Sequence, residues 1–251
     1  MKFENKSVVV TGASSGMGWD IARAFAAEGA TVIAVARRKE RLESLAESAR
    51  ELPGKILPYP GDVSLEDVNE GMIDYALEVC GKLDILINNA GIMDEFIPIG
   101  ELTDETWQKI LKVNLEGPMF AMRKAVQVMQ KQGGGSIVNI ASIGGVRGCR
   151  AGAAYTASKH ALVGLTQNTA YMYAGDHIRC NVLCPGGVET EVMNSQTHIS
   201  QCGMGRVMAG LDRTIAAGRP ADIADAVLYM AGDPGYLNGS VIVLDGGVSC
   251  N

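Results

Sequence analysis

A tyrosine and a lysine four residues apart, Tyr155 and Lys159, carry the clearest chemistry in this sequence. The segment 153–174 has the pattern of a helix, so their side chains would share one face about one turn apart. A free phenol titrates near pH ~10, and a neighbouring ammonium is expected to lower its pKa by favouring the phenolate. The pair is therefore predicted to act in general acid/base catalysis. Ordinary helices also contain this spacing, as a packed tyrosine beside a solvated lysine, so other positions must support the prediction.

Two further polar residues, Asn114 and Ser142, stand in apolar surroundings. Ser142 ends a predicted strand at 136–142, and the glycine-rich loop that follows it could fold its hydroxyl onto Tyr155. Asn114 lies within a long predicted helix at 103–132. Each also has a structural interpretation, because Asn114 could bend its helix and Ser142 could cap a turn.

A glycine-rich turn near the N-terminus connects a β-branched strand pattern at 6–12 to a helical pattern at 19–28. Glycines there would let backbone N–H groups approach a pyrophosphate, and the start of the helix adds the positive end of its dipole. The alternative is an ordinary tight turn. The pattern predicts a dinucleotide site that includes Gly12, Ser14, Ser15, Gly16, Met17 and Gly18.

The second predicted strand, 31–35, is followed by Ala36, Arg37 and Arg38. A site for NAD(H) usually carries a carboxylate at this place, which hydrogen-bonds the ribose hydroxyls. Two guanidinium groups suit a 2′-phosphate instead. The sequence therefore predicts NADP(H) as the cofactor rather than NAD(H), unless the arginines are solvated charges at the start of a helix.

Alternating strand and helix patterns predict an α/β fold, a Rossmann-like doubly wound parallel sheet of about seven strands with helices on both faces. Ligands bind such sheets at the carboxyl ends of the strands. Asp62 stands at one such end and could meet an adenine amino group or cap a helix. Further candidates at these ends are Val63, Asn89, Ala90, Gly91, Pro185 and Gly186.

Size and composition limit the kind of protein. The 251 residues are 47% hydrophobic, which predicts one domain, 1–251, with a sizeable core. The formal charge of −6 disfavours nucleic acid and anionic membranes as partners, so a small-molecule substrate is expected. No membrane span, signal peptide pattern or metal-ligand cluster is evident, and six scattered cysteines suggest reduced thiols in the cytoplasm. The segment 189–214, with weak periodicity, is predicted to form a mobile substrate lid.

Taken together, the glycine-rich turn at 11–18, Asn88-Asn89-Ala90-Gly91, Ser142, Tyr155 with Lys159, Pro185-Gly186 and Asp245-Gly246-Gly247 resemble the short-chain dehydrogenase/reductase family. The motifs come in the order of that family along essentially the whole chain. The resemblance implies a nicotinamide cofactor, a homotetramer, and contacts of Val188 and Thr190 with the carboxamide of the nicotinamide. It also implies a catalytic tetrad of Asn114, Ser142, Tyr155 and Lys159, in which Lys159 holds the ribose and Asn114 holds a water in a proton path.

Several activities are compatible with these residues. The leading hypothesis is interconversion of a secondary alcohol and a ketone on a bulky apolar substrate such as a hydroxysteroid, because Met93, Phe96, Ile97, Met193, Met204 and Met208 stand near the predicted cleft and lid. The alternative is a 3-oxoacyl-carrier-protein reductase that uses Arg147 and Arg150 to meet an acidic carrier, although residues 158–161 depart from those reductases. A sugar-nucleotide epimerase would need an extra domain. A non-catalytic dinucleotide sensor would not need the tetrad.

Overall fold

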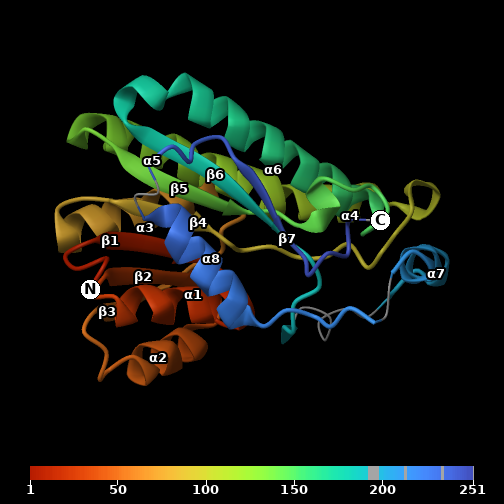
Figure 1. The fold of residues 1–251 in the computed structure, drawn as a ribbon, viewed down its shortest axis with the longest axis horizontal. Helices are drawn as coiled ribbons and strands as arrows, with labels where there is room; N and C mark the ends of the chain where they lie inside the picture. The colour runs from red at the N-terminus through yellow and green to blue at the C-terminus, as the bar shows by residue number, and fades with distance from the viewer. Residues whose placement is uncertain (192–197, 212–213, 233–234, 251) are drawn as a thin grey trace.

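Seven parallel strands form one sheet in the order β3-β2-β1-β4-β5-β6-β7 (Figure 1). This computed structural model describes residues 1–191, 198–211, 214–232 and 235–250. The strands are β1 (Ser7–Thr11), β2 (Thr31–Ala36), β3 (Lys55–Pro60), β4 (Ile85–Asn88), β5 (Gly135–Ile140), β6 (Ile178–Pro185) and β7 (Val241–Leu244). The predicted Rossmann-like α/β class is confirmed.

Helices cover both faces of the sheet, as the alternating sequence pattern requires. They are α1 (Gly16–Ala27), α2 (Lys39–Ser48), α3 (Glu66–Cys80), α4 (Asp104–Leu111), α5 (Gly117–Gln132), α6 (Ala153–Met172), α7 (Gln201–Ala209) and α8 (Pro220–Ala231). Shorter turns are the 3₁₀ segments η1 (Ile99–Glu101), η3 (Ile143–Gly145) and η4 (Ala174–Asp176) and the π-helix η2 (Lys112–Glu116).

Two apolar layers hold the sheet between its helices. Val8 and Val10 of β1 point into a core shared with α1, α2 and α8, whereas Val9 between them points into a core shared with α3 and α5. This alternation follows from the two-residue period of a strand. Because the strand is buried on both sides, all three valines are fully buried, and each is expected to stabilise the fold by about 1.5–3 kcal/mol.

Three local expectations need correction. The long helix at 103–132 is interrupted by the π-helix η2, and the helix that carries Tyr155 ends at Met172 rather than at residue 174. Within the predicted irregular lid, residues 201–209 form α7, which begins at Ser200, whose hydroxyl accepts the Gly203 N–H. Two glycines and one alanine among its nine residues weaken the hydrophobic periodicity by which a helix is predicted. The lid positions 192–197 and 212–213, including Met193, lie outside the described residues.

Candidate active site

The loop between β5 and α6 brings Ser142 to Tyr155. Ser142 lies two residues after the end of β5 and accepts the Gly144 N–H at 3.0 Å, which starts η3. Its side chain lies close to that of Tyr155, since a Cβ at Gly144 would be 3.5 Å from both the Ser142 Oγ and the Tyr155 Cε1. The predicted approach of these two residues is confirmed, and the structural interpretation of Ser142 as a turn cap holds as well. A serine and a tyrosine hydroxyl thus stand together at the carboxyl end of the sheet.

Lys159 lies one turn further along α6 and is almost completely buried, with 3% of its surface exposed. Its Nζ donates a hydrogen bond to the Ile140 carbonyl at 2.9 Å and lies 5.6 Å from the centre of the Tyr155 ring. Gly91 stands opposite, and a Cβ at Gly91 would come within 3.4 Å of the Lys159 Nζ. A side chain at residue 91 would therefore crowd the ammonium.

Burial controls the proton affinities of Tyr155 and Lys159. Tyr155 as a whole is half-buried, but its hydroxyl is surrounded closely enough that desolvation raises its pKa to about 12, against the lowering effect of the Ser142 hydrogen bond. Desolvation likewise lowers the pKa of Lys159 to about 8. The expected lowering of the tyrosine pKa is therefore wrong for the protein alone. Both groups share one poorly solvated region, where each charged form is disfavoured.

Asn114 sits at the centre of the π-helix and is fully buried. Its Oδ1 accepts the Ile92 N–H at 2.9 Å, and its Nδ2 donates to the Ile92 carbonyl at 2.9 Å and to the Ser158 hydroxyl at 3.3 Å. The π-helix has a wider turn than an α-helix and directs the Asn114 amide toward the segment after β4. Asn114 therefore joins η2, the loop after β4 and α6, directly beneath Lys159.

The glycine-rich turn packs against the end of β4 with little space for side chains. Gly12 and Gly16 have left-handed backbones, with φ of 69° and 56°, and a Cβ at Gly12 would lie 2.8 Å from the Ala90 Cα. A Cβ at Gly18 would collide with the Gly12 carbonyl oxygen. These glycines thus let helix α1 begin beside the carboxyl ends of β1 and β4. The predicted strand, turn and helix are confirmed.

Asn89 holds that turn from the neighbouring strand. Its N–H donates to the Thr11 hydroxyl at 3.0 Å, and its Nδ2 donates to the Thr11 carbonyl at 2.9 Å. The Thr11 hydroxyl also accepts the Ala90 N–H at 3.1 Å. The Asn89 Oδ1 is buried and has no hydrogen-bond partner among the described residues. An unpaired buried acceptor is costly, so this atom suits a donor from a bound ligand.

Arg38 reaches from the end of β2 to the glycine-rich turn. Its Nη2 donates to the hydroxyls of Ser14 at 3.0 Å and Ser15 at 2.9 Å. Its Nη1 lies 3.6 Å from Oε2 of Glu191. The other carboxylate oxygen of Glu191, Oε1, lies 3.6 Å from the Arg41 Nη2. A carboxylate from the start of the predicted lid thus already occupies a cationic position formed by two arginines.

The remaining predicted cofactor residues differ in their surroundings. Arg37 is exposed and makes no hydrogen bond or ion pair within the described parts of the chain. Asp62 accepts the Ser64 N–H at 3.0 Å, which favours the turn-forming interpretation of its carboxylate. Thr190 packs on the glycine-rich turn, because a Cβ at Gly16 would lie 3.0 Å from the Thr190 Cγ2. Thr190, Glu189, Glu191 and Gly16 line a hollow of about 380 Å³.

Predicted residues after β6 and β4 complete the same edge of the sheet. Gly186 donates its N–H to the Leu244 carbonyl at 2.9 Å, which aligns the segment after Pro185 with β7, and Val188 bridges to Gly218. Val63, Ala90 and Gly91 lie at the ends of their strands as expected. The structure therefore brings the predicted residues together at the carboxyl edge; Arg37 and Arg38 are both exposed there, but of the two only Arg38 has hydrogen-bond partners among the described residues.

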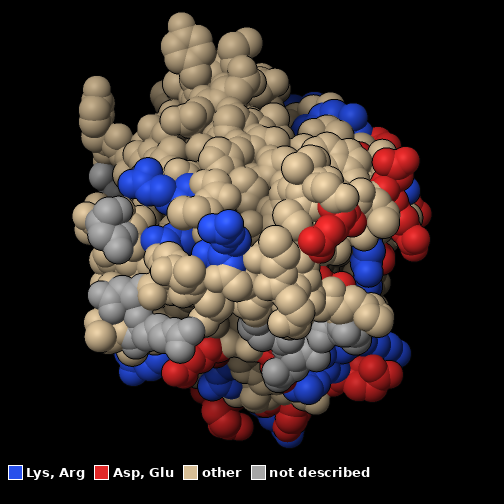
Figure 2. All heavy atoms as spheres, turned by 90° about the vertical axis from the view of Figure 1, so that its right-hand side faces the viewer, with Lys and Arg blue, Asp and Glu red and all other residues tan. Residues whose placement is uncertain are grey.

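The lid helix α7 is anchored to the segment after β4 and to the C-terminal segment. The Ser200 N–H donates to the Glu95 carbonyl at 3.0 Å, and the Ser200 hydroxyl donates to Glu101 at 2.8 Å. Arg150 donates to the carbonyls of Gly210 at 2.8 Å and Val248 at 3.1 Å. Figure 2 shows the side of the molecule on which α7 and the C-terminus lie, where uncharged residues cover most of the visible surface.

Sequence reasoning missed four residues that contact this site. Ser158 bonds Asn114, Cys184 is buried close enough to affect Tyr155 and Lys159, Glu191 pairs with the arginines, and Asp94 binds the start of α6. One signal was available, since the acidic pair Asp94 and Glu95 interrupts the apolar residues of the segment 92–97. The other contacts depend on long-range packing.

A family model for short chain dehydrogenases matches residues 6–200. The chain belongs to the short-chain dehydrogenase family. It is therefore an oxidoreductase that acts on alcohol or ketone groups with a nicotinamide dinucleotide, and not a sensor without catalysis.

Individual relatives span nearly the full chain. The chain is 41% identical to 3beta-hydroxysteroid dehydrogenase 2 of Eggerthella lenta over 246 residues, which are 97% of this chain and 95% of the relative. It is 36% identical to the 3-oxoacyl-[acyl-carrier-protein] reductase FabG of Thermotoga maritima, with 99% of each chain covered. The crystal structure of levodione reductase matches with a TM-score of 0.90 at 32% identity and covers 99% of both chains.

Within the described ranges, no three His, Cys, Asp or Glu side chains are grouped so that they could hold a metal ion. No described helix of this short-chain dehydrogenase is long and apolar enough to cross a bilayer.

Proposed function

We propose that this dehydrogenase interconverts a bulky apolar secondary alcohol and its ketone with NADP(H), and that Asn114, Ser142, Tyr155 and Lys159 form its catalytic group. The close approach of the Ser142 and Tyr155 side chains, one helical turn from buried Lys159, is the observation that carries this proposal. Two hydroxyls that meet at the carboxyl edge of the sheet can hold one substrate oxygen between them.

Ketone reduction assigns a separate task to each hydroxyl. The Ser142 hydroxyl donates a hydrogen bond to the carbonyl oxygen and stabilises the charge that develops there, while the Tyr155 phenol donates the proton that completes the alcohol. When bound, the nicotinamide supplies the hydride to the carbonyl carbon. In alcohol oxidation the Tyr155 oxygen takes the proton from the hydroxyl instead. A raised pKa of about 12 keeps Tyr155 protonated at neutral pH, which favours the reductive direction.

Lys159 and Asn114 support the proton transfer. We assign to Lys159 the hydroxyls of the nicotinamide ribose, because its ammonium lies beside Gly91, which has no side chain to cover it. Within the described residues, Asn114 Oδ1 accepts the Ile92 N–H and has a second lone pair, which can hold a water in a proton path behind Lys159.

NADP(H) fits the cationic position beside the glycine-rich turn. Arg38 and the hydroxyls of Ser14 and Ser15 converge there, and the Glu191 carboxylate lies where an anion is attracted by Arg38 and Arg41. A 2′-phosphate would replace Glu191 as the partner of Arg38 with charge-assisted hydrogen bonds. Because Arg37 is directed to solvent, Arg38 rather than Arg37 is the main determinant of the preference.

The other cofactor residues follow from the same placement. The unpaired Asn89 Oδ1 and the side-chain-free surface of Gly12, Gly16 and Gly18 fit a dinucleotide laid across the turn. The residues proposed to contact it are Gly12, Ser14, Ser15, Gly16, Met17, Gly18, Arg38, Asp62, Val63, Asn89, Ala90, Gly91, Tyr155, Lys159, Pro185, Gly186, Val188 and Thr190.

A hydroxysteroid-like substrate is supported by the lid and by the state of Arg150. Met204 and Met208 on α7 and Met93 after β4 are half-buried, and flexible thioethers adapt to irregular apolar ligands. Arg150 donates to two backbone carbonyls, so it is less available to an acidic carrier protein. The relative from Eggerthella lenta named as a 3beta-hydroxysteroid dehydrogenase agrees with this choice.

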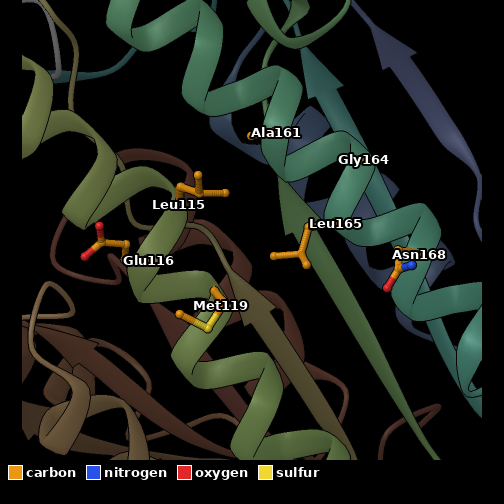
Figure 3. Close-up of a pocket in the computed structure, with 7 residues that line it drawn as sticks. All are labelled: Leu115, Glu116, Met119, Ala161, Gly164, Leu165 and Asn168. Atoms are coloured by element: carbon orange, nitrogen blue, oxygen red, sulfur yellow. The ribbon is translucent and has the colours of Figure 1, made fainter.

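A homotetramer is proposed from two separate apolar faces. One is an open groove of about 500 Å³ between α5 and α6, away from Tyr155, in which Leu165 points across toward Met119 (Figure 3). The other contains exposed Tyr229, Tyr236 and Val243 at α8 and the edge strand β7. Two different self-complementary faces on one chain produce a tetramer rather than a dimer.

We also infer a cytoplasmic protein with one catalytic unit over 1–251 and a substrate lid at 189–214. All six cysteines are free thiols, which suits a reducing compartment. All seven strands contribute to one sheet, so the cofactor and catalytic residues share one scaffold.

The activity test is a screen of ketones and alcohols with NADPH, NADP⁺, NADH and NAD⁺, followed by the absorbance of the reduced cofactor. The set includes 3-ketosteroids with the matching 3-hydroxysteroids and a 3-oxoacyl thioester. We expect the highest kcat/KM for a steroid pair with the phosphorylated cofactor. Higher kcat/KM for the thioester would replace the substrate proposal, and no turnover of any pair would reject both.

A further inference from the structure

A buried carboxylate, Asp94, binds the start of the helix that carries Tyr155. Asp94 lies in the loop between β4 and η1 and is 1% exposed. Its Oδ2 accepts the backbone N–H of Tyr155 at 2.8 Å, and its Oδ1 accepts the N–H of Gly152 at 3.2 Å. Gly152 occupies the N-cap position of α6 and has no side chain that could accept these N–H groups. A residue 61 positions earlier in the chain therefore supplies the cap.

The loop that carries Asp94 and the first turn of α6 pack closely against each other. A Cβ at Gly152 would lie 2.5 Å from each carboxylate oxygen of Asp94. Glu95 and Phe96, the next residues of the loop, have left-handed backbones with φ of 57° and 61°, a costly conformation for side chains of this size. The Ala153 N–H then donates to the Ile97 carbonyl at 2.8 Å. The loop is thus held in an unfavourable conformation against the first turn of α6.

The charge of Asp94 acts on the same residue that its hydrogen bond positions. Burial raises the pKa of Asp94 above that of a free carboxylic acid, while hydrogen bonds from the backbone N–H groups of Tyr155, Gly152 and Phe96 favour its ionised form. A negative charge beside a phenol opposes formation of a second negative charge, and Asp94 raises the pKa of Tyr155 in this way. The other groups near the Tyr155 phenol are Ser142, which lowers that pKa, Cys184, which raises it, and the Lys159 ammonium, which lies 5.6 Å from the centre of the Tyr155 ring.

We propose that Asp94 is a positioning residue of this site, whose carboxylate fixes the backbone of Tyr155 against Ser142 and places a negative charge at the start of the helix that carries the phenol. The inference rests on the proposed role of Tyr155. The carboxylate also compensates the positive end of the α6 dipole, which would otherwise favour the tyrosinate. Both effects of its charge have the same sign, so its removal should promote the deprotonated tyrosine.

The main test compares Asp94→Asn with wild type in the pH dependence of alcohol oxidation, which needs the deprotonated phenol. We expect the midpoint of the profile to move to lower pH by about half a unit or more, and kcat at the optimum to fall by roughly tenfold, with KM for the cofactor unchanged. Asp84→Asn is the matched control, because Asp84 is a partly buried carboxylate that accepts the Ser7 N–H at the opposite edge of the sheet. A midpoint that is the same in wild type and Asp94→Asn would overturn the proposal.

Gly152→Ala provides a second route if Asp94→Asn does not fold. Gly152 has φ of −75°, which alanine adopts readily, but the added methyl group would lie 2.5 Å from the Asp94 carboxylate oxygens and from the Ile97 backbone nitrogen, so it must displace the loop and its carboxylate without removing the charge of Asp94. We expect kcat to fall by roughly tenfold with unchanged cofactor KM, and wild-type kcat would overturn the positioning role. Tyr155→Phe distinguishes failure of the proposed function from failure of the proposed role of Asp94. If Tyr155→Phe retains wild-type turnover, the proposed function fails. If Tyr155→Phe is inactive and the pH profile of Asp94→Asn is unshifted, only the role of Asp94 is rejected.

Discussion

The Nζ of Lys159 lies 5.6 Å from the centre of the Tyr155 ring, one helical turn away, and is hydrogen-bonded to a β5 carbonyl rather than to the phenol. The two groups share a buried region in which the phenol keeps its proton more strongly than usual and the ammonium holds its proton less strongly. The protein alone is therefore set for proton donation by Tyr155, and the following experiments examine each part of that arrangement.

Tyr155→Phe should lower kcat by several orders of magnitude while the dissociation constant of the cofactor stays nearly unchanged. The ring still packs on α6, but the proton of the phenol is lost. Steady-state rates and cofactor titration by fluorescence measure the two quantities. Tyr75→Phe, on α3 away from the site, is the control and should behave as wild type. Turnover near the wild-type rate in Tyr155→Phe would remove this residue from the mechanism.

The pH dependence should differ between the two reaction directions. Because the pKa of Tyr155 is raised to about 12, its protonated form prevails from neutral to moderately alkaline pH. Ketone reduction should therefore lose no proton donor at Tyr155 over this range, whereas alcohol oxidation should rise with pH because the tyrosinate fraction increases. Initial rates in both directions between pH 6 and about 10 test this. An oxidation rate that falls steadily over the range would contradict the assignment.

Lys159→Met should abolish efficient turnover and yet raise the free energy of unfolding at pH 7 by about 1–2 kcal/mol. The pKa of Lys159 is about 8 in the folded protein and near 10.5 unfolded, so folding at neutral pH requires a charged group in a poorly solvated place. Between these pH values the unfolded chain binds more protons, and wild-type stability should rise with pH. Methionine removes that rise, so the difference between variant and wild type should shrink toward pH ~10.

Urea denaturation at two pH values measures this difference. Lys131→Met, which replaces an exposed lysine on α5, is the control and should change stability little at either pH. If Lys159→Met were less stable than wild type at pH 7, the hydrogen bond to Ile140 would outweigh the cost of burying the ammonium.

Arg38→Met should weaken NADPH binding by about tenfold to somewhat over a hundredfold, since one charge-assisted hydrogen bond contributes roughly 1.5–3 kcal/mol. Arg37→Met should have a much smaller effect, because Arg37 is exposed and Arg38 contacts Ser14 and Ser15. Glu191→Gln should strengthen NADPH binding more than NADH binding, since it removes the carboxylate that lies between Arg38 and Arg41. Titrations at fixed ionic strength decide the matter, and a wild-type preference for NADH would reject the NADP(H) proposal.

Leu165→Glu should reduce the mass of the assembly in solution, because it puts a charge into the apolar groove between α5 and α6. Light scattering after gel filtration measures the mass. Leu65→Glu changes an equally apolar but exposed residue at the start of α3 and should leave the mass unchanged. An unchanged tetramer mass in Leu165→Glu would place the subunit contact elsewhere.

Local sequence patterns were sufficient for much of this protein. The alternation of strand and helix patterns predicted the parallel sheet, and the four-residue spacing of Tyr155 and Lys159 placed both on one face of α6, because helical geometry depends only on near neighbours. The glycine-rich turn was equally readable. Its glycines compensate for local crowding between a strand end and a helix start.

Tertiary structure decided the features that depend on residues far apart in the chain. Arg38 rather than Arg37 reaches the serines of the glycine-rich turn, and Asp94 reaches the backbone of Tyr155, 61 positions away. The direction of the Tyr155 pKa also belongs here: the sequence suggested that Lys159 would lower it, whereas burial raises it. Desolvation is the combined effect of every segment packed around a group. No spacing along the chain can therefore reveal its size, or whether it outweighs the effect of a neighbouring charge on the pKa.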